Sequence, residues 1–381
     1  MPHDTMTAAR PVMPQPAPPR VWVLASPHTG DNRQLMALAN GLDWPHEVKQ
    51  LSYRWHEGLV RLAGRPTLSA LDARSRRSIV APYPDLIIAA GRPTEAVAMW
   101  IRRHGNPAVK IVFVGTPWTP LERFDLVIAT PQYRMPSRTN VLHNALPLHD
   151  VGPQKLAKEA KDWSARLAHL PRPLTAVLVG GSSGPYVFSR RAATRLGQQA
   201  SRIAQQDGGA LLISTSARTS PDVTDALFAA ITVPHHAYRY AANSGENPFF
   251  AYLAQADRII VTADSVSMIS EATATGKPVL LFDIEEGRRA MRAEERQYVS
   301  DTNLPKLPWR GADLSSTAFR LAMRMGPPRW SRDLRIIHRS ITKAGQASWI
   351  DDPQPSRTPL PRQDLEHAVD RIRHLMEPVM R

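Results

Sequence analysis

The sequence of 381 residues contains no cysteine. This absence excludes disulfide bonds, thiolate metal sites and a cysteine nucleophile. Long apolar runs are absent too, since no window approaches the ~18 uninterrupted apolar residues of a membrane-spanning helix. The first 20 residues also lack the apolar core of a secretory signal. The sequence therefore predicts a cytoplasmic protein that is at most peripheral to the inner membrane.

Positive charge is in excess, because 48 Lys and Arg residues stand against 34 Asp and Glu residues, a net charge of +14. The excess is densest between Arg288 and Lys343, with 13 basic and 5 acidic residues. Solvated helix faces would explain this pattern, and an anionic membrane surface or a phosphorylated ligand is the alternative. No aromatic or glycine-rich motif is interleaved with these arginines, so we expect no specific nucleic-acid partner.

Short apolar segments alternate with helical patterns along most of the chain. Continuous apolar strands, each followed by a turn-rich loop and a helix, predict parallel sheets that are covered on both faces. The expected strands are 21–26, 85–90, 110–115, 125–130 and 140–146 in one half, and 174–179, 209–215, 258–262 and 278–282 in the other. The predicted fold class is therefore α/β, with two parallel sheets in tandem.

Breaks in this pattern divide the chain into five parts. Residues 1–20 contain six prolines and are predicted to be a disordered tail, and residues 21–150 form the first α/β half. Residues 151–173 contain one linking helix, and residues 174–330 form the second half. Residues 331–381 are expected to be helical and to pack back on the first half, because the final helix has one apolar side.

The loop from Gly180 to Gly184, which reads Gly180-Gly181-Ser182-Ser183-Gly184, is the strongest candidate for a ligand site. In open parallel sheets, ligands bind beyond the carboxyl ends of the strands. Small residues let backbone N–H groups approach a phosphate, and the helix that follows adds its positive end. A glycine-rich turn without a ligand is the alternative. The loop also fits the G-x-S-x-G motif of serine hydrolases, but the only histidines beyond Asp264 lie in helix-like tail sequence, which disfavours a triad.

A second candidate is the loop after the strand at 258–262, where Asp264, Ser265 and Ser267 lie at the start of a helix. Asp264 or Ser265 could cap this helix, and Ser267 could offer a hydroxyl at its N-terminus. Glu271 follows about two turns after Asp264, and its carboxylate could accept two hydrogen bonds from a ribose diol. A capped helix without any ligand would contain the same residues.

The first loop of the first half contains His28 and Asp31. An imidazole there could take a proton from an acceptor hydroxyl near neutral pH, and Asp31 could do the same or orient the histidine. Helix capping is the alternative role for both residues. His235 and His236 are adjacent and would face opposite sides of a strand, and no Asp-x-Asp pair occurs in a candidate loop, so we expect no metal.

Three segments together resemble a known family. The segments are VWVLASPHTGDNRQLMALANGL (21–42), LTAVLVGGSSGPYVFS (174–189) and NPFFAYLAQADRIIVTADSVSMISEATATGKPV (247–279). They are similar to the Elm (elongated mitochondria) family, which takes its name from a plant mitochondrial-fission factor. The similarity covers about residues 20–350 and is most distinctive in the last two segments.

The resemblance implies a fold of the GT-B glycosyltransferase type, in which two Rossmann-like domains face each other across a nucleotide-sugar cleft. Residues 21–150 would form the acceptor-side domain and residues 174–330 the nucleotide-binding domain. The donor would contact the loop from Gly180 to Gly184, the residues Asp264, Ser265 and Ser267, and Glu271, while His28 or Asp31 would be the base. No metal and no other cofactor would be required.

The expected function is therefore metal-independent transfer of a sugar from a UDP- or GDP-type donor to an unidentified acceptor, envelope and lipid-linked acceptors included. The alternative that the resemblance implies is a non-catalytic adaptor or scaffold that acts at a membrane surface.

Overall fold

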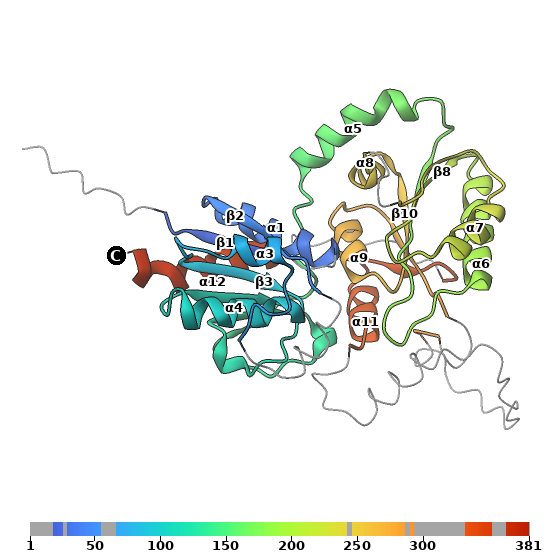
Figure 1. The fold of residues 1–381 in the computed structure, drawn as a ribbon. Helices are drawn as coiled ribbons and strands as arrows, with labels where there is room; N and C mark the ends of the chain where they lie inside the picture. Colours follow the sequence, from blue (N-terminus) through green and yellow to red (C-terminus); the bar gives the residue numbers. More distant parts are fainter. Residues whose placement is uncertain are drawn as a thin grey trace, which may run out of the picture.

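The structure is a computed structural model and describes residues 18–25, 29–54, 66–241, 246–285, 290–292, 332–352 and 363–380. The predicted disordered tail, apart from residues 18–20, and the candidate base His28 lie outside the described residues. Two α/β domains lie side by side, and the helix α5 (Pro153–Leu167) belongs to the connection between them (Figure 1).

The first domain is built on a parallel sheet of six strands in the order β2-β1-β3-β4-β5-β6. These strands are β1 (Val21–Ala25), β2 (His46–Gln50), β3 (Leu86–Ala90), β4 (Lys110–Val114), β5 (Leu126–Ala129) and β6 (Val141–His143). Its helices are α1 (Thr29–Leu42), α3 (Ala73–Ser78) and α4 (Arg92–His104), with 3-10 turns η1 (Leu121–Arg123) and η2 (Pro131–Tyr133). Val23 packs with α1 on one face, and Trp22 packs with α4 on the other. Both residues belong to β1, and this strand is apolar at every position because both faces of the sheet are covered.

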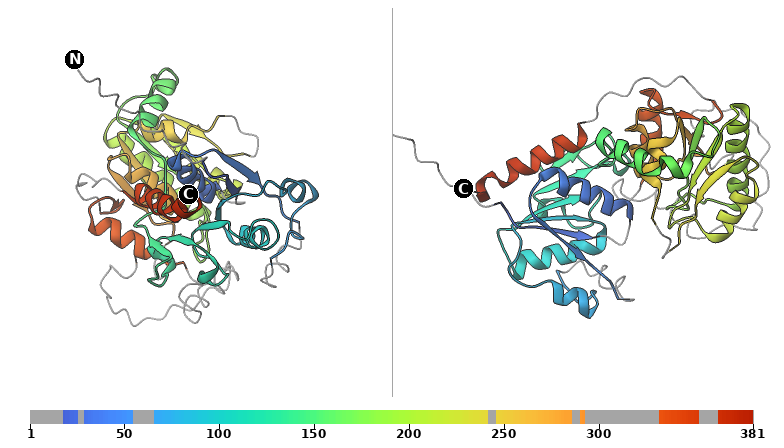
Figure 2. Two further views of the ribbon diagram at one scale, coloured as in Figure 1. Left: turned by 90° about the vertical axis from the view of Figure 1, so that its left-hand side faces the viewer. Right: turned by 90° about the horizontal axis from the view of Figure 1, so that it is seen from above.

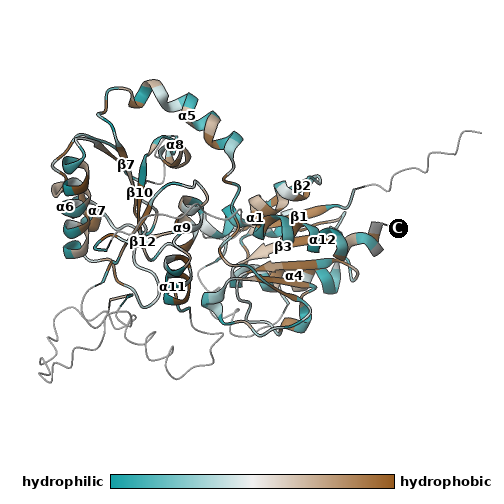
Figure 3. Cartoon of the chain, turned by 180° about the vertical axis from the view of Figure 1, so that it is seen from behind, coloured by the Kyte–Doolittle hydropathy of each residue, from teal (hydrophilic) through white to brown (hydrophobic). Residues whose placement is uncertain are grey.

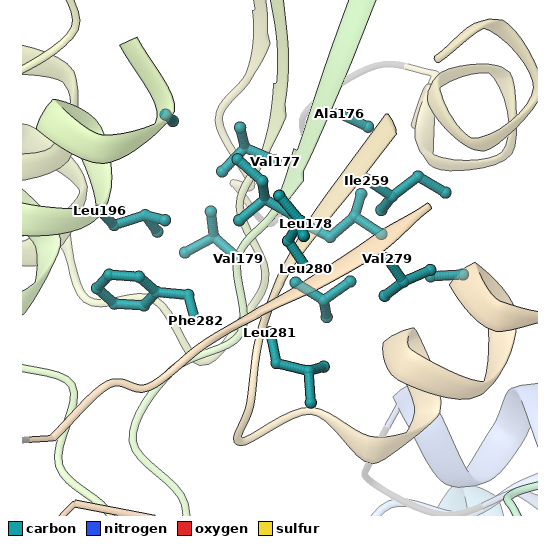
Figure 4. Packing of buried hydrophobic residues seen from close by; sticks show 14 of the residues in the cluster. Ala176, Val177, Leu178, Val179, Leu196, Ile259, Val279, Leu280, Leu281 and Phe282 are labelled. Carbon is teal, nitrogen blue, oxygen red and sulfur yellow. The ribbon is translucent and has the colours of Figure 1, made fainter. Parts of the chain in front are cut away.

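The second domain repeats this construction with the strand order β12-β11-β10-β7-β8-β9, again parallel throughout. Its strands are β7 (Leu174–Leu178), β8 (Ala210–Ser214), β9 (His235–Tyr238), β10 (Arg258–Thr262), β11 (Val279–Phe282) and β12 (Ser348–Trp349). Its helices are α6 (Arg190–Gln206), α7 (Pro221–Ala229), α8 (Phe249–Gln255), α9 (Val266–Thr273) and α11 (Arg335–Lys343). Figure 4 shows side chains of β7, β10 and β11 packing together, with Leu196 of α6 and Phe282 beside them.

Two separate parallel sheets in facing domains confirm the expected α/β fold of the GT-B type. Figure 3 shows the same distribution of polarity in both domains, with apolar strands at the centre and polar residues on the outer helices. All nine strands expected from apolar runs are present within one to three residues of their predicted ends. The edge strands β2, β9 and β12 were not among the nine, because none of them contains an apolar run.

The helix α12 (Asp364–Met380) returns the chain to the first domain, where it packs against α1 (Figure 2). A Cβ atom placed on Gly41 of α1 would lie 2.9 Å from Val369 Cγ2, so the two helices are in close contact. Asp364 Oδ2 accepts hydrogen bonds from the N–H groups of Ala145 and Leu146, both at 3.1 Å. Within the described residues, no helix is long and apolar enough to cross a membrane.

Candidate functional site

The loops at the carboxyl ends of both sheets meet where the domains touch. A Cβ atom placed on Gly30, in the first turn of α1, would lie 3.3 Å from Ser267 Oγ in the first turn of α9. At a second contact, the N–H of Asp333 donates to the carbonyl of Gln132 in η2 at 3.0 Å. The loops that follow β3 and β4 lie between these contacts, because β1 and β5 flank those two strands in the sheet. The carboxyl edge of the first sheet therefore faces the second domain.

The helix α9 makes three contacts with the first domain. Ser267 lies against Gly30, and Ser270 Oγ donates to the carbonyl of Pro147 at 2.7 Å. Glu271 accepts hydrogen bonds from Arg33 Nη1 at both carboxylate oxygens, each at 3.1 Å. The helix that was expected to hold a ligand is thus also the main point of attachment between the domains.

The Glu271 carboxylate is 3% exposed and is paired with Arg33, whose side chain is 26% exposed. Burial raises the pKa of Glu271, and the Arg33 guanidinium lowers it and partly offsets that rise. Arg33 also stacks over the ring of Phe249 at 4.3 Å from its centroid. A ribose diol would have to displace Arg33 or share the carboxylate with it, which the sequence did not predict.

The glycine-rich loop uses several of its N–H groups within the protein. Gly180 N–H donates to Thr262 Oγ1 at 2.8 Å, and Gly181 N–H donates to Asp264 Oδ2 at 3.0 Å. Ser183 N–H donates to the carbonyl of Tyr186 at 2.9 Å. Three of the N–H groups that were expected to approach a phosphate are therefore engaged within the protein, by Thr262 of β10, by Asp264 just after β10 and by Tyr186 just after the loop.

Steric contact explains the two leading glycines of the loop. A Cβ atom on Gly180 would lie 2.3 Å from Asp264 Oδ2, and one on Gly181 would lie 2.0 Å from the carbonyl oxygen of Arg218. No side chain fits at either position. Gly184 has a positive φ of 58°, a conformation that glycine adopts without strain. The helix α6 begins at Arg190 and is capped by Ser189, so residues 185–188 separate the loop from the N-terminus of this helix.

Asp264 is fully buried and does not cap α9. The N-cap residue of α9 is Ser265, and no side-chain capping bond is made there, which corrects the expected role of both residues. Asp264 Oδ2 instead accepts Gly181 N–H and pairs with Arg218 Nη1 at 2.8 Å. Its other oxygen, Oδ1, is buried without a hydrogen-bond partner among the described residues. The charged carboxylate therefore links the glycine loop to Arg218.

The serines of the loop have different environments. Ser182 Oγ accepts the N–H of Phe188 at 3.0 Å, so it closes the turn that follows the loop. Ser183 Oγ accepts from Arg332 Nη1 at 3.5 Å. The structure thus brings Gly181, Ser183 and Asp264 together with two arginines that the sequence analysis did not single out.

In the first domain, Asp31 lies in the first turn of α1 and His28 lies outside the described residues. Glu95 of α4 is buried and accepts the N–H groups of Trp118 at 3.0 Å and Thr119 at 2.8 Å. Burial raises the pKa of Glu95 although these N–H groups lower it. This carboxylate fixes the loop after β4, on which Trp118 is 41% exposed.

His338 is a buried residue of this region that the sequence analysis left in the tail. Its Nε2 lies 2.7 Å from the carbonyl oxygen of Ala263, next to Asp264, and its Nδ1 has no partner among the described residues. Burial lowers the pKa of His338 to about 4, so the ring is neutral at physiological pH. No local pattern could have placed it there, because α11 returns from 75 residues along the chain. Across the described ranges, no three His, Asp or Glu side chains are grouped to hold a metal ion.

Comparisons with known proteins agree with the resemblance seen in the sequence. A family model described as mitochondrial fission ELM1 matches residues 29–303. The mitochondrial fission protein ELM1 of Arabidopsis thaliana is 31% identical over 219 residues, and the match covers 51% of this chain and 51% of that protein, so the chain spans about half of its length. An uncharacterized protein of Rickettsia prowazekii is 28% identical over 299 residues, covering 69% of this chain and 82% of that protein. Among solved structures, a UDP-glucosyltransferase from Polygonum tinctorium has a TM-score of 0.46 and 12% identity, over 95% of this chain and 99% of that one.

Proposed function

The chain belongs to the mitochondrial fission ELM1 family, and from this premise we propose that it binds a nucleotide sugar between its two domains and transfers the sugar without a metal ion. The observation that carries the proposal is the contact between Gly30 of α1 and Ser267 of α9. It supports a shared site, because the candidate base Asp31 lies in the same first turn of α1 as Gly30, beside the helix with the candidate donor residues.

The proposed reaction is an in-line displacement at the anomeric carbon. His28 or Asp31 takes the proton of the acceptor hydroxyl, whose oxygen forms the new bond to the anomeric carbon. The bond from that carbon to the diphosphate breaks, and its electron pair stays on the diphosphate oxygen. The N-terminus of α9 and the hydroxyls of Ser265, Ser267 and Ser183 stabilise the charge that develops there.

A second candidate function is a non-catalytic adaptor that acts at a membrane surface. The Arg33–Glu271 ion pair favours it, because the carboxylate proposed to hold the ribose is already engaged by the first domain. A rigid junction between domains serves a scaffold, whereas a transferase needs that junction to admit a donor.

Ligand-dependent melting separates the two candidates. UDP, GDP and their sugars at 100 times the Kd would stabilise a binding protein by about 2.7 kcal/mol, which corresponds to a rise of roughly 5–10 °C in Tm. Glu271→Gln keeps an acceptor for Arg33 but weakens the diol contact, so it should reduce the rise. The control is Glu246→Gln at an exposed ion pair with Arg166. No nucleotide effect at millimolar ligand would favour the adaptor.

Turnover requires a separate assay, the release of nucleoside diphosphate in the presence of candidate acceptors. His28→Ala should abolish release if this histidine is the base. His143→Ala is the matched control, because His143 is exposed on β6 at the edge of the first sheet. Equal loss in both variants would contradict a role for His28.

A further inference from the structure

Two arginines contact the glycine loop in the second domain. Arg218, in the loop between β8 and α7, donates from Nη1 to the carbonyl of Gly181 at 3.3 Å and pairs with Asp264. Arg332, just before α11, contacts Ser183 Oγ. The three segments are far apart in the sequence, so the tertiary fold alone assembles this cluster.

The cluster has an excess of positive charge. Asp264 is the one carboxylate that pairs with Arg218, and no carboxylate pairs with Arg332 among the residues that the structure describes. The nearby Asp333 is already engaged by Arg134 at 2.7 Å and by Arg335 at 2.9 Å. One carboxylate therefore faces two guanidinium groups at the loop.

Some guanidinium N–H groups of these two arginines have no hydrogen-bond acceptor among the described residues. Arg332 Nε is buried and has no acceptor within the described ranges, which is an unfavourable state for a charged donor. The Arg218 side chain is 38% exposed, and only its Nη1 has a partner in the described part of the chain. Both guanidinium groups thus have N–H groups left to bind an acceptor from outside the protein.

We propose that Arg218 and Arg332 form a diphosphate-binding pair, with one guanidinium on each side of the loop from Gly181 to Ser183. Guanidinium groups bind phosphate oxygens through paired, charge-assisted hydrogen bonds. The two anchoring residues are two positions apart, so at most about 7 Å of chain separates them. A separation of this size suits the two phosphates of a single diphosphate group. The inference deepens the proposed function, because arginines take over the role expected of the loop amides.

Titration calorimetry of the full-length protein with inorganic pyrophosphate tests the pair. Arg332→Gln is the main variant, because Arg332 forms no ion pair with any of the described residues. It should weaken pyrophosphate binding by about tenfold or more. Arg258→Gln is the matched control. Arg258 pairs with Asp207 and is 32% exposed, but it lies at the amino end of β10, away from the loop, so binding should be unchanged.

Asp264→Asn should change pyrophosphate affinity in the direction opposite to Arg332→Gln. Its amide oxygen can keep both interactions of Oδ2, while the amide nitrogen takes the place of the unpartnered Oδ1. Removal of the negative charge should tighten pyrophosphate binding several-fold if Arg218 binds phosphate. A purely structural role for Arg218 would give no tightening, which would remove it from the pair.

Parallel titrations with UDP and GDP keep this inference distinct from the proposed function. Pyrophosphate binding that depends on Arg332, without any nucleotide binding, would support the pair and contradict a nucleotide-sugar site. Nucleotide binding that is unchanged in both Arg332→Gln and Arg218→Gln would overturn the pair and leave the proposed function intact. Absence of pyrophosphate and nucleotide binding would overturn both.

Discussion

Breaking the ion pair between Arg33 and Glu271 should destabilise the protein in a pH-dependent way. The Glu271 side chain, which is 4% exposed in the parent protein, loses the partner of both its oxygens in Arg33→Met. An unpaired buried charge costs about 3–5 kcal/mol, and we expect about 3 kcal/mol, because Arg33 is partly exposed and water can enter its place. For domains of this size, that loss lowers Tm by roughly 6–12 °C.

The double variant Arg33→Met/Glu271→Gln separates the charge from the lost packing. With Gln at position 271, no buried charge remains, so the double variant should be more stable than Arg33→Met alone by about 2 kcal/mol. Arg239→Met is the control, because Arg239 also combines an ion pair, to Asp225, with stacking on a phenylalanine ring. That pair is exposed and lies within one domain, so its loss should change stability by less than about 1 kcal/mol.

The pH dependence follows from the direction of the pKa shift. Burial raises the pKa of Glu271, and Arg33→Met raises it further because the guanidinium no longer lowers it. A carboxyl with a raised pKa in the folded state destabilises the fold as pH rises through that pKa, and the penalty vanishes below the ordinary value. The difference in Tm between Arg33→Met and the parent protein should therefore shrink as pH falls from about 7.5 to about 4.5. A difference that does not change with pH, or that matches Arg239→Met, would refute this account.

Three further predictions concern single buried residues. Because the pKa of His338 falls from 6.5 to about 4 on folding, stability should be lost as pH falls through that interval, and His338→Gln should flatten the dependence of the urea midpoint on pH. Gly181→Ala should cost about 3 kcal/mol with or without ligand, because its Cβ would meet a backbone oxygen at 2.0 Å, whereas Gly152→Ala, with no atom within 4 Å, should cost less than about 1 kcal/mol in the same melts. Glu95→Ala removes the acceptor of two half-buried N–H groups, those of Trp118 and Thr119, and should cost about 1–3 kcal/mol, and faster hydrogen exchange at Trp118 would locate the effect.

The sequence predicted the central strands well because a strand covered on both faces must be apolar at every position. β3, for example, is buried along its whole length. The edge strand β2 (His46–Gln50) has one buried side chain and four that are exposed or half-buried, so its sequence contains no such run. β12 has only two residues and is defined by its pairing with β11 rather than by a pattern of its own.

The sequence indicated residues of the candidate site but not their contacts. The small residues of the glycine loop are compatible with an anion site and with close packing, and only the tertiary neighbours Asp264 and Arg218 show that packing accounts for two of them. Likewise, nothing near Glu271 in the sequence indicates Arg33, which is 238 residues away. Long-range partners of this kind are set by packing within the second domain and by the way the two domains meet, which local patterns do not encode.

The position of α12 has a consequence for how the protein is made. Ala368, Val369, Ile372 and Met376 of this helix are buried in the core between α1 and the first sheet. During synthesis, the strands of the first domain leave the ribosome long before these residues do, so one side of its core stays open to water until α12 has been made. Of the two domains, the one whose strands are synthesised first is thus completed last, and a chain truncated before α12 would expose apolar surface on its first domain.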